Sequence, residues 1–293
     1  MPSAIILCAG FGTRLRPLTD ELPKPLVPVG DRTILEHAID CLRGAGISEL
    51  VVNVHHLAEV FERTVRGFAE PVRVTIETEI RGTAGGVAGA RKYLSNAPVL
   101  VWNGDILVAP PLDQLLVGSE PDAYCLGVSP RAPGEGNVGL DARGQVVRLR
   151  GERFGEEASS GDYVGVISLG AGVVASLPER GCMVGDVALP RLRAGGRISS
   201  VSVTTPWTDA GDPKSLLAAN LAWLRFRGLD GFVADGATVA RTVQVRDSLV
   251  GAGARVIGEG LLERCVVCAG ATATAPLRDA IVAPSGRVIA AHV

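Results

Sequence analysis

The sequence predicts an α/β fold with a doubly wound, mostly parallel sheet, followed by a small C-terminal solenoid. Apolar runs of strand length alternate with helical patterns through the first half of the chain, as they do in βαβ units. Apolar residues make up 47% of the 293 residues and aromatic residues only 4%, which suits a large aliphatic core. Residues 229–293 contain a regular repeat, which is typical of a solenoid.

The first half of the chain supplies the parallel sheet. The predicted strands are residues 4–8, 50–54, 72–77 and 99–105, and the predicted helices are residues 34–46, 56–68 and 84–94. Thr33 is the expected N-cap of the first helix, and Gly44 or Gly46 is expected to end it. This βαβ alternation implies a doubly wound, largely parallel sheet with right-handed crossovers.

The pattern becomes less regular from about Asp122. Strand-like segments at 124–128, 146–150 and 163–169 are separated by turns rich in glycine and glutamate, which indicates an insertion into the sheet. A long helical run at 212–228 follows. We therefore expect one domain over residues 1–228 and a second over residues 229–293.

The second domain is predicted from its internal repeat. Val233, Val250, Val267 and Val282 follow one another at steps of 17, 17 and 15 residues, and the glycines at 236, 253, 270 and 286 keep pace. Short strand-like segments recur before each turn, so that each coil can stack its apolar residues on the next. The pattern resembles the hexapeptide-repeat left-handed β-helix, in a short and degenerate form.

Composition and charge narrow the class of protein. The 29 basic and 31 acidic residues nearly cancel, so no net field attracts nucleic acid or an anionic membrane, and we expect neither partner. The N-terminal MPSAIILCAGFG has no basic leader, and its apolar run is too short to span a membrane. Six scattered cysteines fit reduced, mostly buried thiols, and the pair Cys265 and Cys268 lacks the further ligands that zinc needs. We expect a cytoplasmic protein.

The loop after the first strand has the residues of a phosphate-binding loop. Gly10 and Gly12 allow backbone N–H groups to approach a phosphate, Thr13 can donate to an oxygen, and Arg14 can bind two oxygens at once. The Gly-Lys-Ser/Thr of a P-loop and the third glycine of a dinucleotide fingerprint are both missing. Lys24 follows ten residues after Arg14, between two prolines that stiffen its segment.

With this loop and the lysine that follows it, the sequence resembles the sugar-1-phosphate nucleotidyltransferase family, also called NDP-sugar pyrophosphorylases. The family signature is an AGxGTRLRPLT loop followed by PKPL, which stand here as residues 9–19 and 23–26. RGTAGGVAGA, VLVWNGD and PWTDAGDP match three further family elements in the same order, over most of residues 1–225. The resemblance implies the nucleotide-diphospho-sugar transferase fold and the transfer of a nucleotidyl group from a nucleoside triphosphate to a sugar 1-phosphate, with release of pyrophosphate.

The resemblance also implies roles for individual residues. Arg14 and Lys24 are the expected catalytic residues that contact the phosphates, and Asp105 and Asp209 the expected ligands of Mg²⁺. The residues expected to bind the nucleotide are Leu7, Ala9, Gly10, Gly12, Thr13, Gly82, Thr83, Asn103 and Gly104. Physical reasoning supports the metal site, because both aspartates follow apolar runs at the carboxyl edge of the sheet, and Mg²⁺ favours carboxylates with phosphate oxygens. Asn-Gly-Asp is also good turn chemistry, and Asp20, Asp186 and Asp212 are alternatives to Asp209 on spacing alone.

The sugar half of the site departs from the family pattern. The family's Glu-Lys-Pro element, whose lysine holds the sugar phosphate, is replaced by VVRLRGERFGEE, which contains no lysine. Glu152 and Arg153 are the nearest match, and Arg148 or Arg150 is an alternative for the phosphate. Gly139 and Gly165 match glycines that approach the sugar in the family.

Several alternatives remain open at this stage. The amino-acid sequences of these motifs favour GTP and mannose 1-phosphate as the substrates. Uridylyl or thymidylyl transfer to another sugar 1-phosphate is an alternative. A β-helix is also found in acyltransferases, but residues 229–293 contain only His292 as a catalytic histidine candidate. The altered sugar element would suit a regulatory subunit that binds a nucleotide sugar without turnover. We expect a homo-oligomer, formed through the β-helix, or an allosteric role for it.

Overall fold

The computed structural model describes residues 2–69, 71–95, 98–116 and 120–291, so His292 lies outside the described residues. The chain forms two compact units, each of which is described by itself. Unit 1 comprises Met1–Gly10, Ala38–Ala58 and Val65–Trp207, and unit 2 comprises Phe11–His37, Glu59–Thr64 and Thr208–Val293. The expected division of the chain after residue 228 stays a prediction. Within the described part of the chain, no helix is long and apolar enough to cross a membrane.

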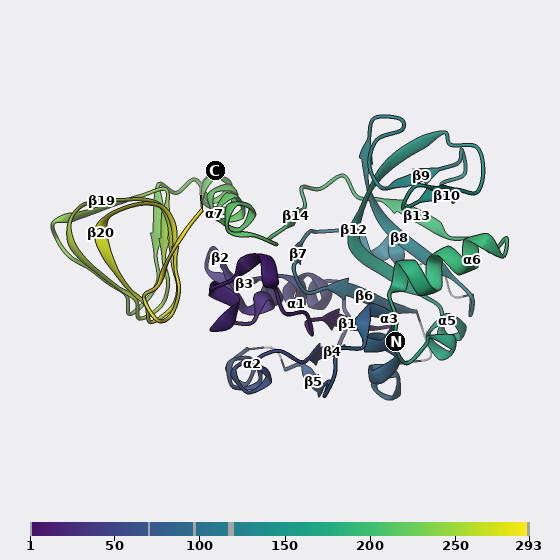
Figure 1. The fold of residues 1–293 in the computed structure, drawn as a ribbon, viewed down its shortest axis with the longest axis horizontal. Coiled ribbons are helices and arrows are strands. Elements are labelled where there is room, and N and C mark those ends of the chain that lie inside the picture. The colour runs from purple at the N-terminus through teal and green to yellow at the C-terminus, as the bar shows by residue number, and fades with distance from the viewer. Residues whose placement is uncertain (1, 70, 96–97, 117–119, 292–293) are drawn as a thin grey trace. The chain divides into compact units, whose positions relative to one another are not determined.

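Unit 1 is built on a ten-stranded mixed sheet (Figure 1). Its strands are β1 (Ser3–Leu7), β4 (Glu49–Val54), β5 (Arg73–Ile76), β6 (Val99–Asn103), β8 (Tyr124–Arg131), β9 (Val138–Leu140), β10 (Val146–Leu149), β11 (Glu152–Arg153), β12 (Ser159–Leu169) and β13 (Ser199–Ser202). The order is β11-β10-β9-β12-β6-β1-β4-β5, and β8 pairs with β12 and β13. β5, β4, β1 and β6 are parallel, whereas β12 runs antiparallel to β6. The predicted α/β class is confirmed.

The helices follow the predicted alternation in the first half of the chain. The helices up to residue 193 are α1 (Ile34–Gly44), α2 (Ala58–Val65), α3 (Gly82–Ala90), α4 (Leu112–Leu115), α5 (Ala171–Ser176) and α6 (Leu189–Arg193), with the 3₁₀ turn η4 (Arg91–Tyr93) and the π-helical turn η5 (Met183–Ala188). Thr33 caps α1 as expected, because its Oγ1 accepts from the Glu36 N–H at 3.2 Å. The helical segment at 183–193 was not predicted, since its glycine and proline interrupt any helical pattern.

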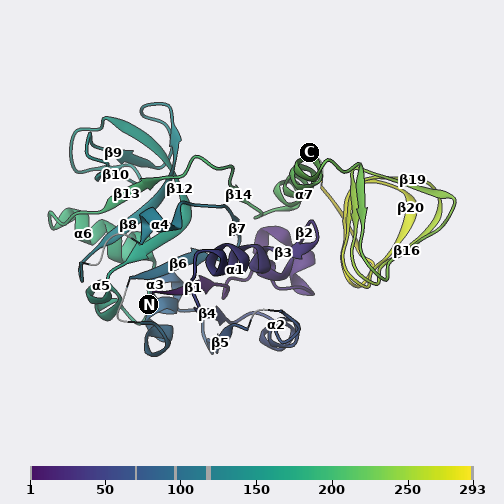
Figure 2. The same ribbon diagram turned by 180° about the vertical axis from the view of Figure 1, so that it is seen from behind.

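The inserted antiparallel strands form the part of unit 1 farthest along the sheet from β5. β9, β10 and β11 extend the sheet beyond β12, and Figure 2 shows β9 and β10 at the opposite end of this unit from β4 and β5. A continuous aliphatic core runs beneath both parts, from Ile5 and Val101 in the parallel strands to Val138 and Leu149 in the insertion. One core therefore fixes the parallel strands and the insertion to each other.

Unit 2 contains the loop that carries Arg14 and Lys24, together with the C-terminal strands. Its elements are the 3₁₀ turns η1 (Thr13–Leu15), η2 (Leu18–Asp20) and η3 (Lys24–Leu26), strands β2 (Pro28–Val29), β3 (Arg32–Thr33) and β14 (Thr208–Asp209), and helix α7 (Pro213–Arg227). A capping box starts α7, in which Asp212 accepts from the Ser215 N–H at 2.8 Å, and the left-handed Gly228 ends it.

The C-terminal strands stack as the sequence repeat predicts. They are β15 (Gly231–Val233), β16 (Thr238–Val239), β17 (Val243–Arg246), β18 (Ser248–Val250), β19 (Arg255–Val267), β20 (Thr272–Val282) and β21 (Val288–Ala290). Val233 pairs with Val250, Val250 with Val267 and Val267 with Val282, in parallel. Figure 1 shows β19 and β20 as turns that follow the same three-sided path. This stacking is consistent with the β-helix expected from the sequence, and we call residues 231–290 the C-terminal repeat.

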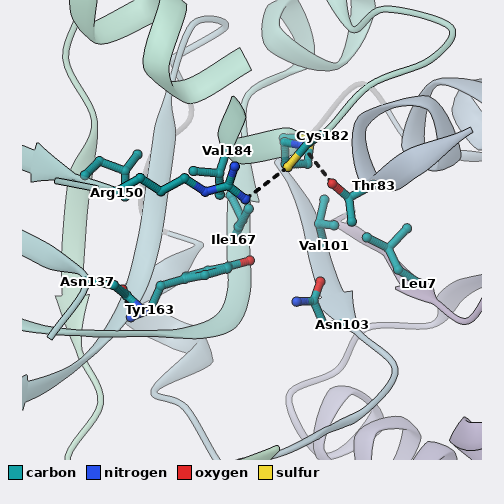
Figure 3. Close-up of a pocket in the computed structure, with 12 residues that line it drawn as sticks. Leu7, Thr83, Val101, Asn103, Asn137, Arg150, Tyr163, Ile167, Cys182 and Val184 are labelled. Atoms are coloured by element: carbon teal, nitrogen blue, oxygen red, sulfur yellow. Dashed lines mark hydrogen bonds between the residues drawn. The ribbon is translucent and has the colours of Figure 1, made fainter. Parts of the chain in front are cut away.

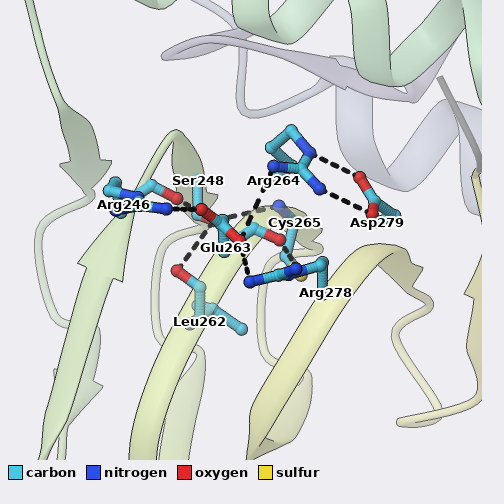
Figure 4. Close-up of polar contacts among 8 residues, drawn as sticks. All are labelled: Arg246, Ser248, Leu262, Glu263, Arg264, Cys265, Arg278 and Asp279. Carbon is cyan, nitrogen blue, oxygen red and sulfur yellow. Dashed lines mark hydrogen bonds and ion pairs between the residues drawn. The ribbon is translucent and has the colours of Figure 1, made fainter.

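A buried carboxylate lies within the C-terminal repeat (Figure 4). The Glu263 side chain is only 2% exposed and is paired with arginines of three stacked coils. Arg246 is in direct contact with it, Arg278 lies 2.6 Å away, and Arg264 lies 3.6 Å away and also pairs with Asp279. Residues 246, 263 and 278 occupy equivalent positions in successive coils, so the alternation of charge follows from the repeat itself.

Candidate active site

The carboxyl edge of the parallel strands in unit 1 carries the predicted nucleotide-binding residues. β1 and β6 are in register from Ser3 with Val99 to Leu7 with Asn103, so Leu7 and Asn103 end their strands side by side. The Gly104 N–H donates to the Leu7 carbonyl at 2.9 Å, and a Cβ at Gly104 would lie 2.7 Å from that oxygen. Only glycine fits this close approach, which brings Asp105 to the sheet edge.

Burial and charge define the surroundings of Asp105. The pKa of the Cys8 thiol is raised well above its usual value, mainly by burial and also by the charge of Asp105. Burial likewise raises the pKa of Tyr163, with smaller contributions from Tyr124 and Asp105. Cys8 and Tyr163 therefore stay neutral near this carboxylate at physiological pH.

A buried polar network at the same edge was missed from the sequence. Asn53 at the end of β4 donates to Glu77 Oε1 at 2.7 Å and accepts from the Cys8 N–H at 2.9 Å, and Glu77 Oε2 accepts from the Arg81 N–H at 3.1 Å. Both side chains are buried. The polar Asn53 within the apolar run LVVNV was the only signal for this network in the sequence. The network fixes the segment that leads into α3.

The start of α3 places two of the predicted nucleotide-binding residues. Gly82 has a left-handed φ of 75°, and a Cβ there would lie 2.5 Å from the Gly181 carbonyl oxygen. Thr83 Oγ1 accepts from the Met183 N–H at 2.7 Å. α3 and the π-helical turn η5 are therefore joined, and Thr83 is held at the boundary between them.

A cavity of about 420 Å³ opens next to Thr83 in unit 1. Its lining residues are Leu7, Thr83, Val101, Asn103, Asn137, Leu149, Arg150, Tyr163, Ile167, Cys182, Met183 and Val184. Figure 3 shows Arg150 and Tyr163 reaching into it from one side, and Thr83, Leu7 and Asn103 lining the other. The cavity combines apolar walls, amide and hydroxyl groups and one guanidinium, which is the character of a small-molecule site.

Arg150 and Cys182 meet within this cavity. Arg150 Nη2 lies 3.5 Å from Cys182 Sγ, and the backbone of Arg150 has a left-handed φ of 49°. The pKa of Cys182 is lowered, although its burial tends to raise it. The opposing contributions are hydrogen bonds from the Gly185 and Val184 backbone, the positive charge of Arg150 and a hydrogen bond with the Thr83 side chain. The sequence offered Arg150 as one alternative among several and gave no sign of Cys182.

The remaining residues of the sugar element are engaged in ion pairs. Arg148 is buried and binds Glu157 through two hydrogen bonds of 2.8 and 3.0 Å, and it donates to two backbone carbonyls as well. Glu152 accepts from Arg193 at 2.6 and 3.0 Å. Arg153 is exposed and lies 4.0 Å from Glu157. Of these residues and Arg150, only Arg150 lines the cavity.

The two predicted sugar-binding glycines lie in different surroundings. A Cβ at Gly165, which has a left-handed φ of 78°, would lie 2.6 Å from Ile106 and 3.3 Å from the Asn103 amide. A Cβ at Gly139 would instead lie 2.5 Å from the Glu157 carboxylate. Gly165 is therefore brought next to a predicted nucleotide-binding residue, whereas Gly139 makes room for the buried Arg148–Glu157 pair.

Unit 2 brings both predicted catalytic cations onto one carboxylate. Lys24 Nζ donates to Asp209 Oδ1 at 3.1 Å, and Arg14 Nη2 donates to Asp209 Oδ2 at 3.0 Å. The Lys24 side chain is 8% exposed, whereas that of Arg14 is 61% exposed. Burial tends to raise the pKa of Asp209, but Arg14 and Lys24 outweigh it and the pKa is lowered. Two cations are thus held together on one carboxylate.

The loop around Arg14 is held by short-range contacts within unit 2. Gly12 has a left-handed φ of 63°, and its carbonyl accepts from Thr19 Oγ1 at 2.9 Å. A Cβ at Gly12 would lie 2.8 Å from the Thr19 side chain. Thr13 is exposed at the start of η1, and Gly10 is also exposed, whereas Ala9 is buried. The glycines therefore let the loop fold tightly while Thr13 and Arg14 face outward.

Both predicted metal ligands have donor chemistry that suits Mg²⁺. Asp209 is ionised and its side chain is 37% exposed, and Asp105 acts as a negative charge on its neighbours. Carboxylate oxygens of this kind are hard ligands that Mg²⁺ combines with phosphate oxygens. Among the described residues, no three His, Cys, Asp or Glu side chains gather into a complete metal site. Each carboxylate by itself thus has the chemistry to hold a metal that is shared with phosphate groups.

The fold and these residues define the chain as an α/β protein with a glycine-rich loop after its first strand and an aspartate, Asp105, just beyond the end of β6 in the sheet. The chain belongs to the nucleotidyl transferase family, whose model matches residues 3–225. The family resemblance expected from the loop motifs is confirmed.

Individual relatives support this assignment. Mannose-1-phosphate guanyltransferase of Aspergillus fumigatus is 30% identical over 75% of this chain, and this chain covers 64% of that protein, less than two thirds of its length. N-acetylmuramate alpha-1-phosphate uridylyltransferase of Caulobacter vibrioides is 32% identical over 74% of this chain and 94% of its own. The crystal structure of HddC from Yersinia pseudotuberculosis, complexed with GMP-PN, is 20% identical, covers 76% of this chain and 100% of its own, and has a TM-score of 0.64, which shows a shared fold.

Proposed function

We propose that this protein transfers a nucleotidyl group from a nucleoside triphosphate to a sugar 1-phosphate, giving a nucleotide sugar and pyrophosphate. The observation that carries the proposal is the pairing of Arg14 and Lys24 on Asp209, within a glycine-rich loop that matches the family. Two cations that share one carboxylate are poised to exchange part of that contact for phosphate oxygens. The preferred substrates in this proposal are GTP and mannose 1-phosphate.

The reaction needs charge neutralisation more than proton transfer. A sugar phosphate has a second pKa of about 6, so its oxygen is already an anionic nucleophile at neutral pH. The difficulty is to bring two polyanions together for in-line displacement at the α-phosphate. Arg14 and Lys24 would neutralise charge on the α-phosphate and on the departing pyrophosphate, and the N–H groups of the glycine loop would donate to the same oxygens.

Mg²⁺ is the proposed cofactor, with Asp105 and Asp209 as its protein ligands. The ion would supply positive charge to the phosphate oxygens in the transition state. Asp209 could keep its hydrogen bonds from Arg14 and Lys24 while it holds the ion, since a carboxylate oxygen can accept from more than one partner. Asp209 would then organise both the metal and the two cations.

For the nucleotide, we propose contacts with residues at the sheet edge and in the loop. Leu7, Thr83, Asn103 and Gly104 would surround the base and ribose, with Gly82 allowing close approach. Ala9, Gly10, Gly12 and Thr13 would approach the phosphates.

For the sugar 1-phosphate, we propose Arg150 in the role that a lysine has in the family. Arg150 is the arginine of the VVRLRGERFGEE element that lines the cavity, and its guanidinium can bind phosphate through two hydrogen bonds. Arg148 and Glu152 are already engaged in ion pairs within the protein. Gly165 would let the backbone approach the sugar, and the neutral Tyr163 hydroxyl would donate to it.

The choice of GTP and mannose 1-phosphate rests on similarity to the guanyltransferases, such as that of Aspergillus fumigatus. The uridylyltransferase of Caulobacter vibrioides favours a second candidate, because this chain covers 94% of it. Uridylyl transfer to another sugar 1-phosphate is therefore the alternative. A homo-oligomer formed through the C-terminal repeat also stays a prediction, which the molar mass in solution tests.

The test is pyrophosphate release with Mg²⁺, with GTP, UTP, dTTP, CTP and ATP each paired with mannose, glucose and N-acetylamino-sugar 1-phosphates. We expect release to require both substrates and to be fastest with GTP and mannose 1-phosphate. Lys24→Ala and Asp105→Ala should each lose about 10²-fold or more in kcat. Lys214→Ala is the matched control for Lys24, because Lys214 is exposed on α7 in the same unit.

The outcomes separate the candidates. Fastest release with UTP would support the uridylyl alternative. Binding of a nucleotide sugar without release from any pair would favour a regulatory subunit and refute the proposed activity. Near-normal turnover by Lys24→Ala would contradict the role given to that residue.

A further inference from the structure

The C-terminal repeat is attached to the Arg14–Lys24 loop by one carboxylate. The Ser285 N–H donates to Glu21 Oε2 at 2.9 Å, and Ser285 Oγ donates to Glu21 Oε1 at 2.6 Å. Both carboxylate oxygens of Glu21 are therefore bound by one residue that lies 264 positions away in the sequence. Hydrogen bonds to a charged acceptor are roughly twice as strong as neutral ones.

Ser285 lies in a turn where the repeat departs from its own period. The spacing falls from 17 residues to 15, and β21 pairs antiparallel to β20 instead of continuing the parallel stack. The Gly286 N–H donates to the Ala283 carbonyl at 2.8 Å, which closes the turn around Ser285. The donors that bind Glu21 are thus presented by a tight turn and not by a mobile tail.

In the sequence, Glu21 lies between Arg14 and Lys24, the two cations of the candidate site. It directly follows η2, in which Thr19 bonds the Gly12 carbonyl next to Arg14, and it precedes Lys24 by three residues. Thr19 and Lys24 are both buried, so a displacement at Glu21 would be transmitted along the chain in both directions. The anchored residue is therefore well placed to fix the spacing of Arg14 and Lys24.

The apolar contact beside this anchor is incomplete. A cavity of about 310 Å³ lies in unit 2 between loop residues, including Leu22 and Leu26, and coil residues, including Val267 and Cys268. Burial raises the pKa of Cys268 to about 12, and the nearby charge of Glu21 contributes. Because a cavity remains between the apolar surfaces, the hydrogen bonds of Glu21 carry a larger share of the attachment.

We propose that Glu21 and Ser285 are positioning residues, through which the C-terminal repeat holds the loop that carries Arg14 and Lys24 in the geometry that binds the triphosphate. The inference rests on the proposed function for its catalytic consequence, but the ordering of the loop is a property of the protein alone. It gives the repeat a direct part in the site, apart from any role in oligomerisation.

The experiment uses the full chain and two independent readouts. Hydrogen–deuterium exchange over residues 11–26 reports the order of the loop, and steady-state kinetics report its effect on turnover. The variants are Glu21→Ala, Ser285→Ala and Ser285→Thr, which keeps the hydroxyl. Thr274→Ala is the control, because Thr274 is exposed on β20 of the same repeat.

We expect Glu21→Ala and Ser285→Ala to increase exchange over residues 11–26 while the Tm falls by only a few degrees. Turnover should fall on the order of tenfold, as a small displacement of positioned groups allows. The KM for the nucleoside triphosphate should rise while that for the sugar 1-phosphate stays the same, a pattern that simple loss of folded protein does not produce. Ser285→Thr should restore most of both readouts.

Unchanged exchange over residues 11–26 in both alanine variants would overturn the inference, and so would changes equal to those in Thr274→Ala. If Glu21→Ala does not fold, Ser285→Ala alone decides, since it removes one hydroxyl from an exposed turn. Absence of pyrophosphate release by the unaltered protein would refute the proposed function, whereas the exchange measurement would still decide whether the repeat orders the loop.

Discussion

Glu263 in the C-terminal repeat offers a sharp test of how a buried charge is stabilised. Its side chain is 2% exposed, and it pairs with Arg246 and Arg278, whose side chains are 58% and 61% exposed (Figure 4). Glu263→Gln keeps the shape but removes the charge, and it turns an N–H₂ group toward guanidinium donors. Glu263→Met removes the polar group altogether and leaves arginines that water can solvate.

The expected change in the free energy of unfolding follows from these contacts. The ion pairs of Glu263 are exposed to water on the arginine side, and pairs that water reaches contribute about 0–1 kcal/mol each. We therefore expect Glu263→Gln to lower the free energy of unfolding by about 2–3 kcal/mol, because the buried amide N–H₂ of Gln also faces guanidinium donors and finds no acceptor there. Glu263→Met should cost less, about 1 kcal/mol, because it buries no polar group and water solvates the half-exposed arginines that lose their partner.

Urea unfolding followed by circular dichroism measures both values. Glu259→Gln is the matched control, since Glu259 is exposed on the same strand β19, and it should stay within about 0.5 kcal/mol of the unaltered protein. A Glu263→Gln variant as stable as this control would refute the reasoning. So would a Met variant that is less stable than the Gln variant, because the argument depends on that order.

Four further predictions concern the candidate site. Arg150→Met should raise the KM for the sugar 1-phosphate about tenfold or more, because it removes a charge-assisted contact to phosphate. Arg153→Met is the control and should leave this KM unchanged. Equal effects of the two variants in steady-state assays would contradict the role of Arg150. Cys182 is the one cysteine of the six whose pKa is lowered, so iodoacetamide at pH 8 should label it first by mass spectrometry, and bound sugar 1-phosphate should slow the labelling. The pKa of Asp209 is lowered on folding, so its contribution to stability is present above the pKa of about 3.9 in the unfolded chain and is lost as the pH falls through the pKa in the folded protein. Asp209→Asn should therefore flatten the acid limb of a plot of Tm against pH. Gly104→Ala should destabilise the protein by about 1–3 kcal/mol in urea unfolding, because the added methyl group would lie 2.7 Å from the Leu7 carbonyl oxygen.

Local patterns in the sequence determined much of the fold. The alternation of apolar runs and helical patterns predicted β1, β4, β5 and β6 and the helices between them, because buried parallel strands need continuous apolar runs. The valine repeat predicted the register of the C-terminal strands, since a coil of constant length must stack equivalent residues on each other. The loop motif identified Arg14 and Lys24 before any contact was known.

The tertiary structure decided which polar residues act together. Sequence spacing left Asp209 among several candidates, and only the folded chain brings it to both Arg14 and Lys24. Three arginines lie within the sugar element, yet burial and ion pairing engage Arg148 while Arg150 lines the cavity. The physical reason is that the partner of a charge can lie far away in the sequence.

The attachment between Glu21 and Ser285 shows the same limit. Neither residue stands out in the sequence, because a glutamate in a loop and a serine in a turn are both ordinary surface residues. Their contact depends on the path of the whole chain, which brings the last turn of the repeat back to the N-terminal loop. The sequence by itself determined periodic elements and local loop chemistry, and tertiary structure determined the pairings, because electrostatic and packing energies depend on distance in space.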